Sequence, residues 1–175
     1  MITPEFNFFL DLIKKELLRK KGVNWAILST LDQERPVART VVLRSLKIID
    51  NEILLRIYTH GLSAKVEQIQ KNANVQVCWY FPAKKVQIQF SGTAVILGAD
   101  VSDKISHSLS ELSRKNYQGI KPGSPYEVEN SSDLHFSVIE VSVEDCTGLH
   151  LGRNEPHLKL TTSKQSHWSS RRLVP

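Results

Sequence analysis

Cysteine is scarce in this chain of 175 residues, in which only Cys78 and Cys146 occur. No Cys-x-x-Cys pair and no cluster of cysteine with histidine accompanies them, which argues against a zinc site and leaves no metal ligands to predict. So little cysteine is typical of proteins from a reducing compartment. A chain of this length can bury a hydrophobic core without disulfides or a structural metal.

Long apolar runs are also missing from the sequence. No stretch is long and apolar enough to span a bilayer. Charged residues such as Glu5, Asp11 and Lys14 are interspersed among the apolar residues of the N-terminus, which is unlike a secretory signal peptide. The sequence therefore predicts a cytoplasmic protein that does not associate with membranes.

Two widespread signature motifs do not occur. The absence of Gly-x-Gly-x-x-Gly disfavours a parallel dinucleotide-binding sheet, and the absence of Gly-x-Ser-x-Gly disfavours a serine hydrolase. The formal net charge of +5 is by itself compatible with a nucleic acid, a phosphorylated ligand or neither. Because the basic residues are dispersed and no aromatic RNA-binding motif accompanies them, we expect a small-molecule partner and no nucleic acid.

The N-terminal segment, residues 1–21, has the pattern of an amphipathic helix. Between residues 5 and 20, apolar side chains recur on one face at Phe6, Phe9, Leu10, Ile13, Leu17 and Leu18. Lysines occupy the opposite face, and Gly22 is a suitable residue to end the helix. We expect this helix to pack on the rest of the fold.

After this helix the sequence changes to patterns that favour β-strands. These patterns cover residues 23–30, 37–49, 53–59, 75–81, 86–97 and 134–143, with shorter strand-like pieces in the tail 149–173. Ser63 is the expected N-cap of a helix between the third and fourth strands, and Gly92 marks an expected bulge or close backbone approach. A further helix is expected over 101–118 with Ser102 as its cap, followed by a loop over 119–133.

Short turns between consecutive strands favour antiparallel pairing and leave no room for crossover helices. The sequence therefore predicts a single, mainly β domain over residues 1–175 with flanking helices, built as a closed or split antiparallel β-barrel. Residues 134–175 supply its C-terminal strands and tail.

Two arginines, Arg39 and Arg44, interrupt an apolar strand. A buried guanidinium is costly unless it is paired, so each needs a partner. Their odd separation directs them to opposite faces of a regular strand, and their partners should therefore differ. In the ordinary alternative, each arginine reaches water or pairs with a carboxylate such as that of Glu52.

The segment from Tyr58 to Lys65 ends a strand, turns at Gly61 and enters a helix at Ser63. The first N–H groups of a helix lack internal partners and lie at the positive end of its dipole. A serine hydroxyl and a lysine ammonium beside them form a site suited to a phosphate. Ordinary capping, with Lys65 in solvent, is the alternative.

Other polar and aromatic residues give weaker signals. Gln87 and Gln89 lie on the polar face of a strand, where they suit either a flavin edge or a solvated sheet surface. The histidines are scattered without metal-ligand spacing. Trp25, Trp79 and Trp168 are expected in the core or at an interface rather than as ligands.

The order and spacing of these signals resemble the pyridoxamine 5'-phosphate oxidase family, and especially its related FMN-binding proteins. The resemblance comprises Arg39-Thr-Val-Val-Leu-Arg44, Tyr58-Thr59, Ser63-Ala-Lys65 with Gln68-Ile69 and Asn72, Gln87 five residues before Gly92, and at the end His157 and the terminal Arg172-Leu-Val-Pro175. It implies a split β-barrel and a homodimer with two FMN sites at the subunit interface, to which the C-terminal tail contributes contacts.

The resemblance also implies roles for individual residues. It assigns Arg39 and Lys65, assisted by Ser63, to the FMN phosphate, and Tyr58 and Thr59 to the lining of the cofactor site. The Thr40, Val41 and Val42 backbone would follow the flavin ring, and Gln87 would contact the flavin. Arg44, His157 and Lys159 would face a small-molecule substrate, which could carry a phosphate. No catalytic residue is assigned.

The chain departs from the oxidases at several positions. Ala64 replaces an arginine, Cys146 lies near the position of a flavin-contacting tryptophan, and Lys159 replaces the arginine of a His-x-Arg motif. FMN binding therefore matches better than pyridoxamine 5'-phosphate oxidation does. We expect an FMN-dependent oxidoreductase whose substrate is open, with a non-catalytic flavin- or haem-binding protein of the same fold as the alternative.

Overall fold

The structure is a computed structural model that describes residues 4–18, 24–125, 132–152 and 157–175. Its helices are α1 (Pro4–Leu17), α2 (Ala64–Lys71), α3 (Ala99–His107) and α4 (Glu111–Lys115), with a short 3-10 helix η1 (Pro82–Lys84). Its strands are β1 (Trp25–Asp32), β2 (Arg35–Ile49), β3 (Glu52–His60), β4 (Asn74–Phe81), β5 (Val86–Ile96), β6 (Phe136–His150), β7 (Leu158–Ser163) and β8 (Arg171–Leu173).

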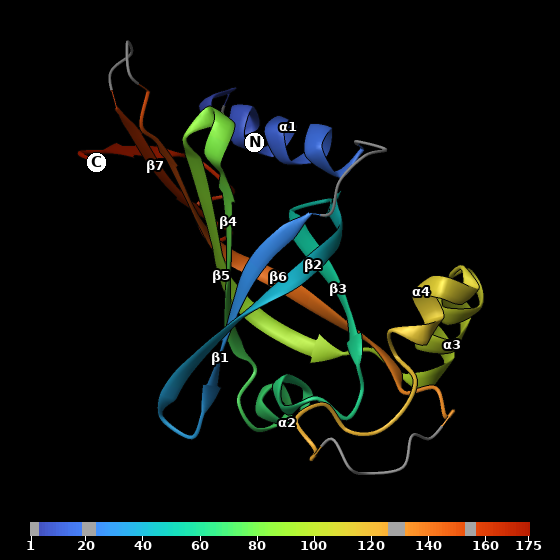
Figure 1. Cartoon of the computed structure of the whole chain (residues 1–175). Helices are drawn as coiled ribbons and strands as arrows, with labels where there is room; N and C mark the ends of the chain where they lie inside the picture. The colour runs from blue at the N-terminus through green and yellow to red at the C-terminus, as the bar shows by residue number, and fades with distance from the viewer. Residues whose placement is uncertain (1–3, 19–23, 126–131, 153–156) are drawn as a thin grey trace.

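The strands form one antiparallel sheet that closes on itself. Their order is β3-β2-β1-β4-β5-β6-β7-β8, and an additional pairing of β3 with β6 completes a ring. β7 and β8 extend from β6 beyond the ring (Figure 1). α1 lies across one end of the barrel, whereas α2 lies at the opposite end with α3 and α4 beside it (Figure 1). The predicted split-barrel fold is confirmed.

Most predicted elements are confirmed, with differences at their ends. β6 continues to His150 instead of stopping at Val143, because its second half pairs with both β5 and β7. The helix expected over 101–118 is two helices, and Ser102 lies inside α3, whose N-cap is Gly98. The expected helix stop at Gly22 falls outside the described residues.

Alternation along β2 separates the two arginines of the motif. Val41 and Leu43 are buried on the inner face together with the inward-directed Arg39, whereas Thr40 and Arg44 are exposed on the outer face. A register shift against β3 follows at Leu43/Ser45. The odd separation of the arginines therefore places them on opposite faces, as predicted.

The pairing of β5 with β6 requires a glycine at position 92. The register shifts between Ser91 and Gly92, which confirms the expected bulge. A Cβ atom at Gly92 would lie 2.0 Å from the carbonyl oxygen of Ser142 on β6. Only a residue without a side chain allows the two backbones to approach this closely.

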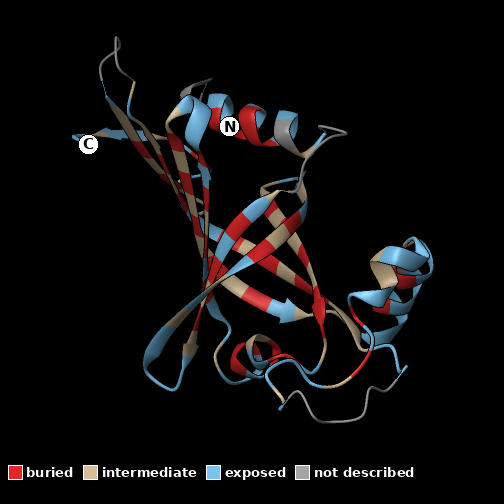
Figure 2. Cartoon of the chain, viewed as in Figure 1, coloured by how far each residue is buried: buried red, intermediate tan, exposed pale blue. Residues whose placement is uncertain are grey.

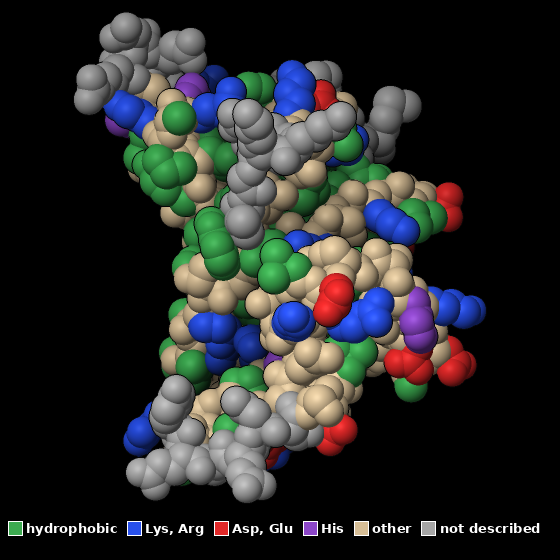
Figure 3. Space-filling view, turned by 45° about the vertical axis from the view of Figure 1, so that its right-hand side comes forward, with side chains coloured by type: hydrophobic (Ala, Val, Ile, Leu, Met, Phe, Trp, Pro, Cys, Tyr) green, Lys and Arg blue, Asp and Glu red, His purple; other side chains and the backbone are tan. Residues whose placement is uncertain are grey.

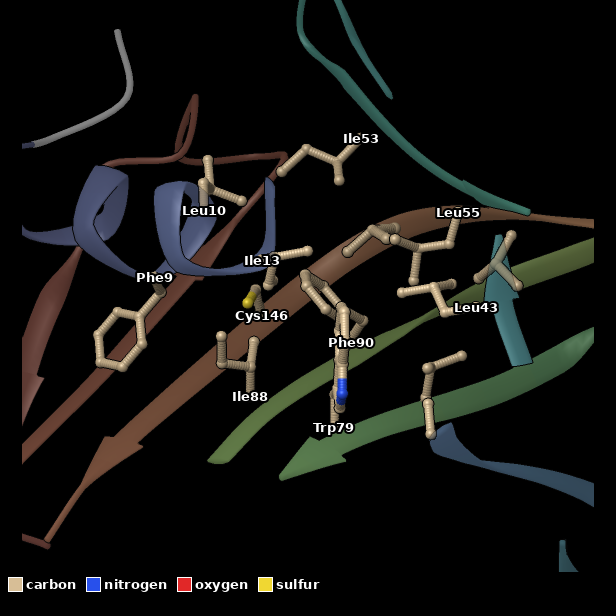
Figure 4. Packing of buried hydrophobic residues seen from close by; sticks show 14 of the residues in the cluster. Phe9, Leu10, Ile13, Leu43, Ile53, Leu55, Trp79, Ile88, Phe90 and Cys146 are labelled. Atoms are coloured by element: carbon tan, nitrogen blue, oxygen red, sulfur yellow. The ribbon is translucent and has the colours of Figure 1, made fainter. Parts of the chain in front are cut away.

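The core fills the barrel and continues under α1. Phe9, Leu10 and Ile13 of α1 belong to the same hydrophobic cluster as Phe90 inside the barrel, and Ile13 points toward Phe90 and Cys146 (Figure 4). Figure 2 shows the resulting alternation of buried and exposed positions along the strands. The Phe9 ring rests on β6 at Gly148, where an added Cβ would lie 2.7 Å from three ring atoms.

The tryptophans divide between core and surface. Trp79 and Trp168 are buried, as predicted. Trp25 is 59% exposed, so the core alternative is wrong for it, because its position on β1 faces outward. No helix in the described ranges is long and apolar enough to cross a membrane.

Candidate functional site

An open pocket of about 350 Å³ lies where β1, β2 and β3 meet α2 and the end of α4. Its lining consists of Trp25, Thr40, Val41, Val42, Arg44, Tyr58, Thr59, His60, Lys65, Asn116 and Tyr117. Six of the predicted cofactor residues and Arg44 are thus brought together by the tertiary structure. None of the lining residues is acidic, so the pocket favours an anionic ligand. Other lysine and arginine side chains are distributed over the face of the molecule drawn in Figure 3.

Arg39 lies beside this pocket, on the inner face of β2. Its Nη1 atom donates to the Thr30 hydroxyl (2.5 Å) and to the Leu28 carbonyl oxygen (3.3 Å). Its Nη2 atom donates to Oε1 of Gln68 (2.7 Å), which also accepts a hydrogen bond from the Thr30 hydroxyl (2.7 Å). All of these acceptors are neutral, so the guanidinium is oriented without being neutralised.

Lys65 supplies a second cation next to Arg39. Its ammonium donates to the Thr59 hydroxyl (3.0 Å), which lies 3.3 Å from the Ser63 hydroxyl. Burial lowers the pKa of Lys65, and the charge of Arg39 lowers it further. Burial also lowers the pKa of Arg39. Arg39, Thr59, Ser63 and Lys65 therefore form a cationic cluster, called the clamp below.

The clamp lies at the start of α2. Ser63 is the N-cap, as predicted, but its side chain makes no capping hydrogen bond and instead contacts Thr59. In the part of the chain that the structure describes, neither Arg39 nor Lys65 forms an ion pair. Glu52, the alternative partner considered for the arginines, pairs with Lys164 and accepts a hydrogen bond from Ser142. The cation pair and the helix start together suit a phosphate.

Arg44 lies at the other end of the pocket, on the outer face. Its guanidinium carbon is 5.4 Å from the centre of the Tyr58 ring, and its Nη2 atom donates to the Tyr117 hydroxyl at 3.4 Å. The rings of Tyr58 and Tyr117 both meet Phe136 edge to face, with centroids 5.2 and 5.0 Å away. Arg44 is thus held against a packed aromatic corner.

His60 closes the inner wall of the pocket. Its Nδ1 atom accepts a hydrogen bond from the Leu62 N–H (3.3 Å), and its buried Nε2 atom has no hydrogen-bond partner among the described residues. The ring lies 5.2 Å from that of His135. Burial lowers the pKa of His60, which favours the neutral imidazole.

Three predicted residues lie away from this pocket within the chain. Gln87 is paired with Tyr80 and Leu149, and Lys159 is paired with Leu149 in turn. His157 is exposed immediately before β7. Within one chain, none of these three residues is among those that line the pocket.

Several site residues were not predicted. Thr30 and Gln68 orient Arg39. The only signal for Thr30 in the sequence is a polar residue at an inward position of a strand, whereas Gln68 belongs to the residues that resemble the family but had no role assigned. Asn116 and Tyr117 follow α4 and reach the pocket only through the fold of the α3–α4 segment.

The fold and the pocket define a split-barrel protein with a cationic clamp beside an open aromatic-lined pocket. A sequence profile described as "Pyridoxamine 5'-phosphate oxidase, FMN-binding domain" matches residues 6–98, which is more than half of the chain. The chain belongs to this family. A comparison with curated proteins gives no significant match.

Solved structures share the fold. A pyridoxamine 5'-phosphate oxidase-related, FMN-binding protein from Nostoc punctiforme is 23% identical with a TM-score of 0.77, and all of both chains is covered. PhzG from Burkholderia lata, solved with tetrahydrophenazine-1-carboxylic acid, is 16% identical with a TM-score of 0.77, covering 100% of this chain and 94% of PhzG. HupZ from Group A Streptococcus is 19% identical with a TM-score of 0.51, covering 89% and 100%.

Proposed function

We propose that this protein binds FMN and acts as a flavin-dependent oxidoreductase on a small, planar, anionic molecule. The observation that carries the proposal is the clamp, in which two partly buried cations have no carboxylate partner among the described residues. Such an arrangement stabilises a bound dianion and is costly without one. It is supported by the family's FMN-binding domain, which covers the clamp residues.

The residues of the pocket fit FMN. Arg39 and Lys65 would hold its phosphate with the hydroxyls of Thr59 and Ser63, and Tyr58 with the Thr40–Val42 backbone would line the remainder. FMN when bound supplies a ring that accepts a hydride, while the protein supplies orientation and electrostatics. Arg44 would orient the anionic substrate at the outer end of the pocket.

Comparing FMN with riboflavin tests the clamp, because the two flavins differ only in the phosphate. We expect the wild-type protein to bind FMN at least 100-fold more tightly by fluorescence titration. Arg39→Ala and Lys65→Ala should abolish most of this preference, whereas Lys71→Ala, an exposed lysine on the same helix, should keep it. Retention of the full preference in both clamp variants would show that the phosphate binds elsewhere.

Anaerobic reduction of the FMN-loaded protein tests the enzymatic part. The substrates to be tried are pyridoxamine 5'-phosphate, pyridoxine 5'-phosphate, reduced nicotinamides and a partly reduced aromatic carboxylic acid, the last suggested by the ligand of PhzG. Bleaching of the flavin by one of them supports an oxidoreductase. Tight FMN binding without reduction would favour the non-catalytic alternative, and a Soret band in the purified protein would indicate haem.

A homodimer is part of the proposal, because the outer face of the sheet presents apolar side chains beside the pocket. Trp25, Ile27 and Tyr80 are exposed there. Across neighbouring strands of the sheet, Tyr80 pairs with Gln87, Gln87 pairs with Leu149, and Leu149 pairs with Lys159. A second copy on this face could bring Gln87 and the C-terminal strands, with His157, to the pocket of the first.

Sedimentation velocity of wild type and Ile27→Glu tests this assembly. We expect a wild-type dimer, a monomeric variant, and weaker FMN binding by the monomer. Val95→Glu, at a more exposed apolar position on β5 near its end, is the control and should remain dimeric. A monomeric wild-type protein that binds FMN tightly would refute the dimer and leave FMN binding intact.

A further inference from the structure

The outer end of the pocket differs in charge from the clamp. The clamp combines two cations with two hydroxyls at the start of a helix. The outer end has one cation, Arg44, with two neutral polar neighbours, Asn116 and Tyr117. Salt bridges among the described residues do not include Arg44, so its charge is available to a ligand.

Tyr117 is fixed in position by its surroundings. It is only 7% exposed, and its ring packs edge to face on Phe136. Its backbone carbonyl accepts a hydrogen bond from the His135 N–H (2.8 Å), which ties the end of α4 to the strand that follows. A residue held in this way loses little entropy when a ligand binds to it.

The contact between Arg44 and Tyr117 also orients the tyrosine proton. The Arg44 Nη2 atom donates to the phenol oxygen, so the phenol uses a lone pair for the arginine. Its own proton therefore points away from the guanidinium and can be donated to a ligand oxygen. Arg44 and Tyr117 can thus both donate to one anionic group, while the face of the guanidinium rests on Tyr58.

We propose that Tyr117 is a specificity-determining residue that, with Arg44, selects a planar aromatic carboxylate over a phosphate ester. A carboxylate carries one negative charge and two coplanar oxygens, which match a guanidinium edge and one hydroxyl donor. A phosphate ester carries nearly two charges and three acceptor oxygens, which a single cation satisfies less well. Tyr58 and the exposed Trp25 provide apolar surface for the ring of such a ligand.

The proposal rests on the proposed function for its place in the reaction, and the experiment is arranged so that the two can fail separately. The probes are 2-naphthoate and 2-naphthyl phosphate, which share one ring system and differ in the anionic group. Calorimetric titrations are made on the full-length protein saturated with FMN, and FMN binding is measured separately beforehand. If FMN does not bind, the proposed function fails while the same two titrations still measure the preference.

We expect naphthoate to bind at least tenfold more tightly than naphthyl phosphate. Tyr117→Phe, which keeps the ring packing, should reduce this ratio about tenfold by weakening carboxylate binding. Arg44→Lys should reduce it further, because a lysine lacks the planar donor pair. Lys71→Ala, at an exposed lysine outside the pocket, should keep the wild-type ratio.

Equal or tighter binding of the phosphate by the wild-type protein would overturn the proposal. An unchanged ratio in Tyr117→Phe would overturn it as well, provided that the variant melts within a few degrees of the wild type. A variant that fails this check is replaced by Asn116→Asp, whose added negative charge beside Arg44 should weaken naphthoate binding. Undiminished naphthoate binding in that variant would place the ligand elsewhere.

Discussion

Gln68 offers the sharpest test of how the clamp works, because it holds Arg39 without neutralising it. Its Oε1 atom accepts from Arg39 and from the Thr30 hydroxyl, each at 2.7 Å. Gln68→Glu keeps the shape and both acceptor contacts but adds a negative charge on the inner side of the guanidinium. This carboxylate would compete with the FMN phosphate for the same cation.

The expected magnitude follows from the geometry. A phosphate bound to the side of the guanidinium opposite Gln68 would lie about 8 Å from the new charge, which is roughly the width of a guanidinium plus two hydrogen-bond contacts. At an effective dielectric constant of about 20, this repulsion amounts to about 2 kcal/mol per unit charge. FMN binding should therefore weaken by about 30-fold or more. The unliganded protein should keep its melting temperature or gain a few degrees, because Arg39 acquires a counter-ion.

Fluorescence titration with FMN and thermal melting of the unliganded protein provide the two measurements. Gln70→Glu makes the same chemical change on the exposed face of the same helix and serves as the control, with less than a threefold effect expected. Riboflavin affinity should fall much less than FMN affinity in Gln68→Glu. Unchanged FMN affinity in a stable Gln68→Glu protein would refute the assignment of Arg39 to the phosphate.

Three further predictions concern the pH dependence of binding and the stability of the fold. FMN affinity should fall as the pH rises through the lowered pKa of Lys65 toward the ordinary value of 10.5, because a bound phosphate favours the protonated ammonium. Lys65→Met should lose this dependence in the same titrations, and a pH dependence equal to that of the wild type would contradict the assignment. Gly92→Ala should destabilise the protein by about 3–4 kcal/mol in urea unfolding, because its Cβ would lie 2.0 Å from the Ser142 oxygen and force β5 from β6. Gly98→Ala, where an added Cβ meets nothing within 4 Å, should cost less than about 1 kcal/mol, and equal losses in the two variants would be inconsistent with the close approach. Phe9→Ala should cost about 3–5 kcal/mol, because the side chain is fully buried between α1 and the barrel, and a loss below 1 kcal/mol would show that α1 is not docked there.

Periodicity in the sequence was sufficient for most of the fold. Alternating apolar residues defined the strands, and the short turns between them required antiparallel neighbours, so a barrel of this kind followed. The same local logic separated Arg39 from Arg44, since side chains alternate along any strand regardless of its neighbours. Reasoning from local pattern failed for residues 101–118. Two short helices with different N-caps follow each other there, and their combined sequence pattern resembles that of one continuous helix.

Residues that act through distant contacts were beyond prediction from the sequence. Gln68 and Thr30 meet Arg39 from different elements, and nothing in their local surroundings indicates that shared contact. Tyr117 reaches Arg44 across 73 positions of the chain. Gln87 was predicted on the polar face of its strand and Lys159 was assigned to the substrate by the resemblance, but the distance of both from the pocket within one chain could be seen only in three dimensions.

By itself, the sequence determined the strand pattern, the helix start at Ser63 and the presence of two differently directed arginines, because each depends on residues close together along the chain. Only the tertiary structure decided that Arg39 and Lys65 share one clamp with no carboxylate partner among the described residues, and that Arg44 is held by Tyr58 and Tyr117. The charges and the burial of side chains in a pocket depend on which elements form its walls. The pairing of β3 with β6, which closes the barrel, determines which elements those are.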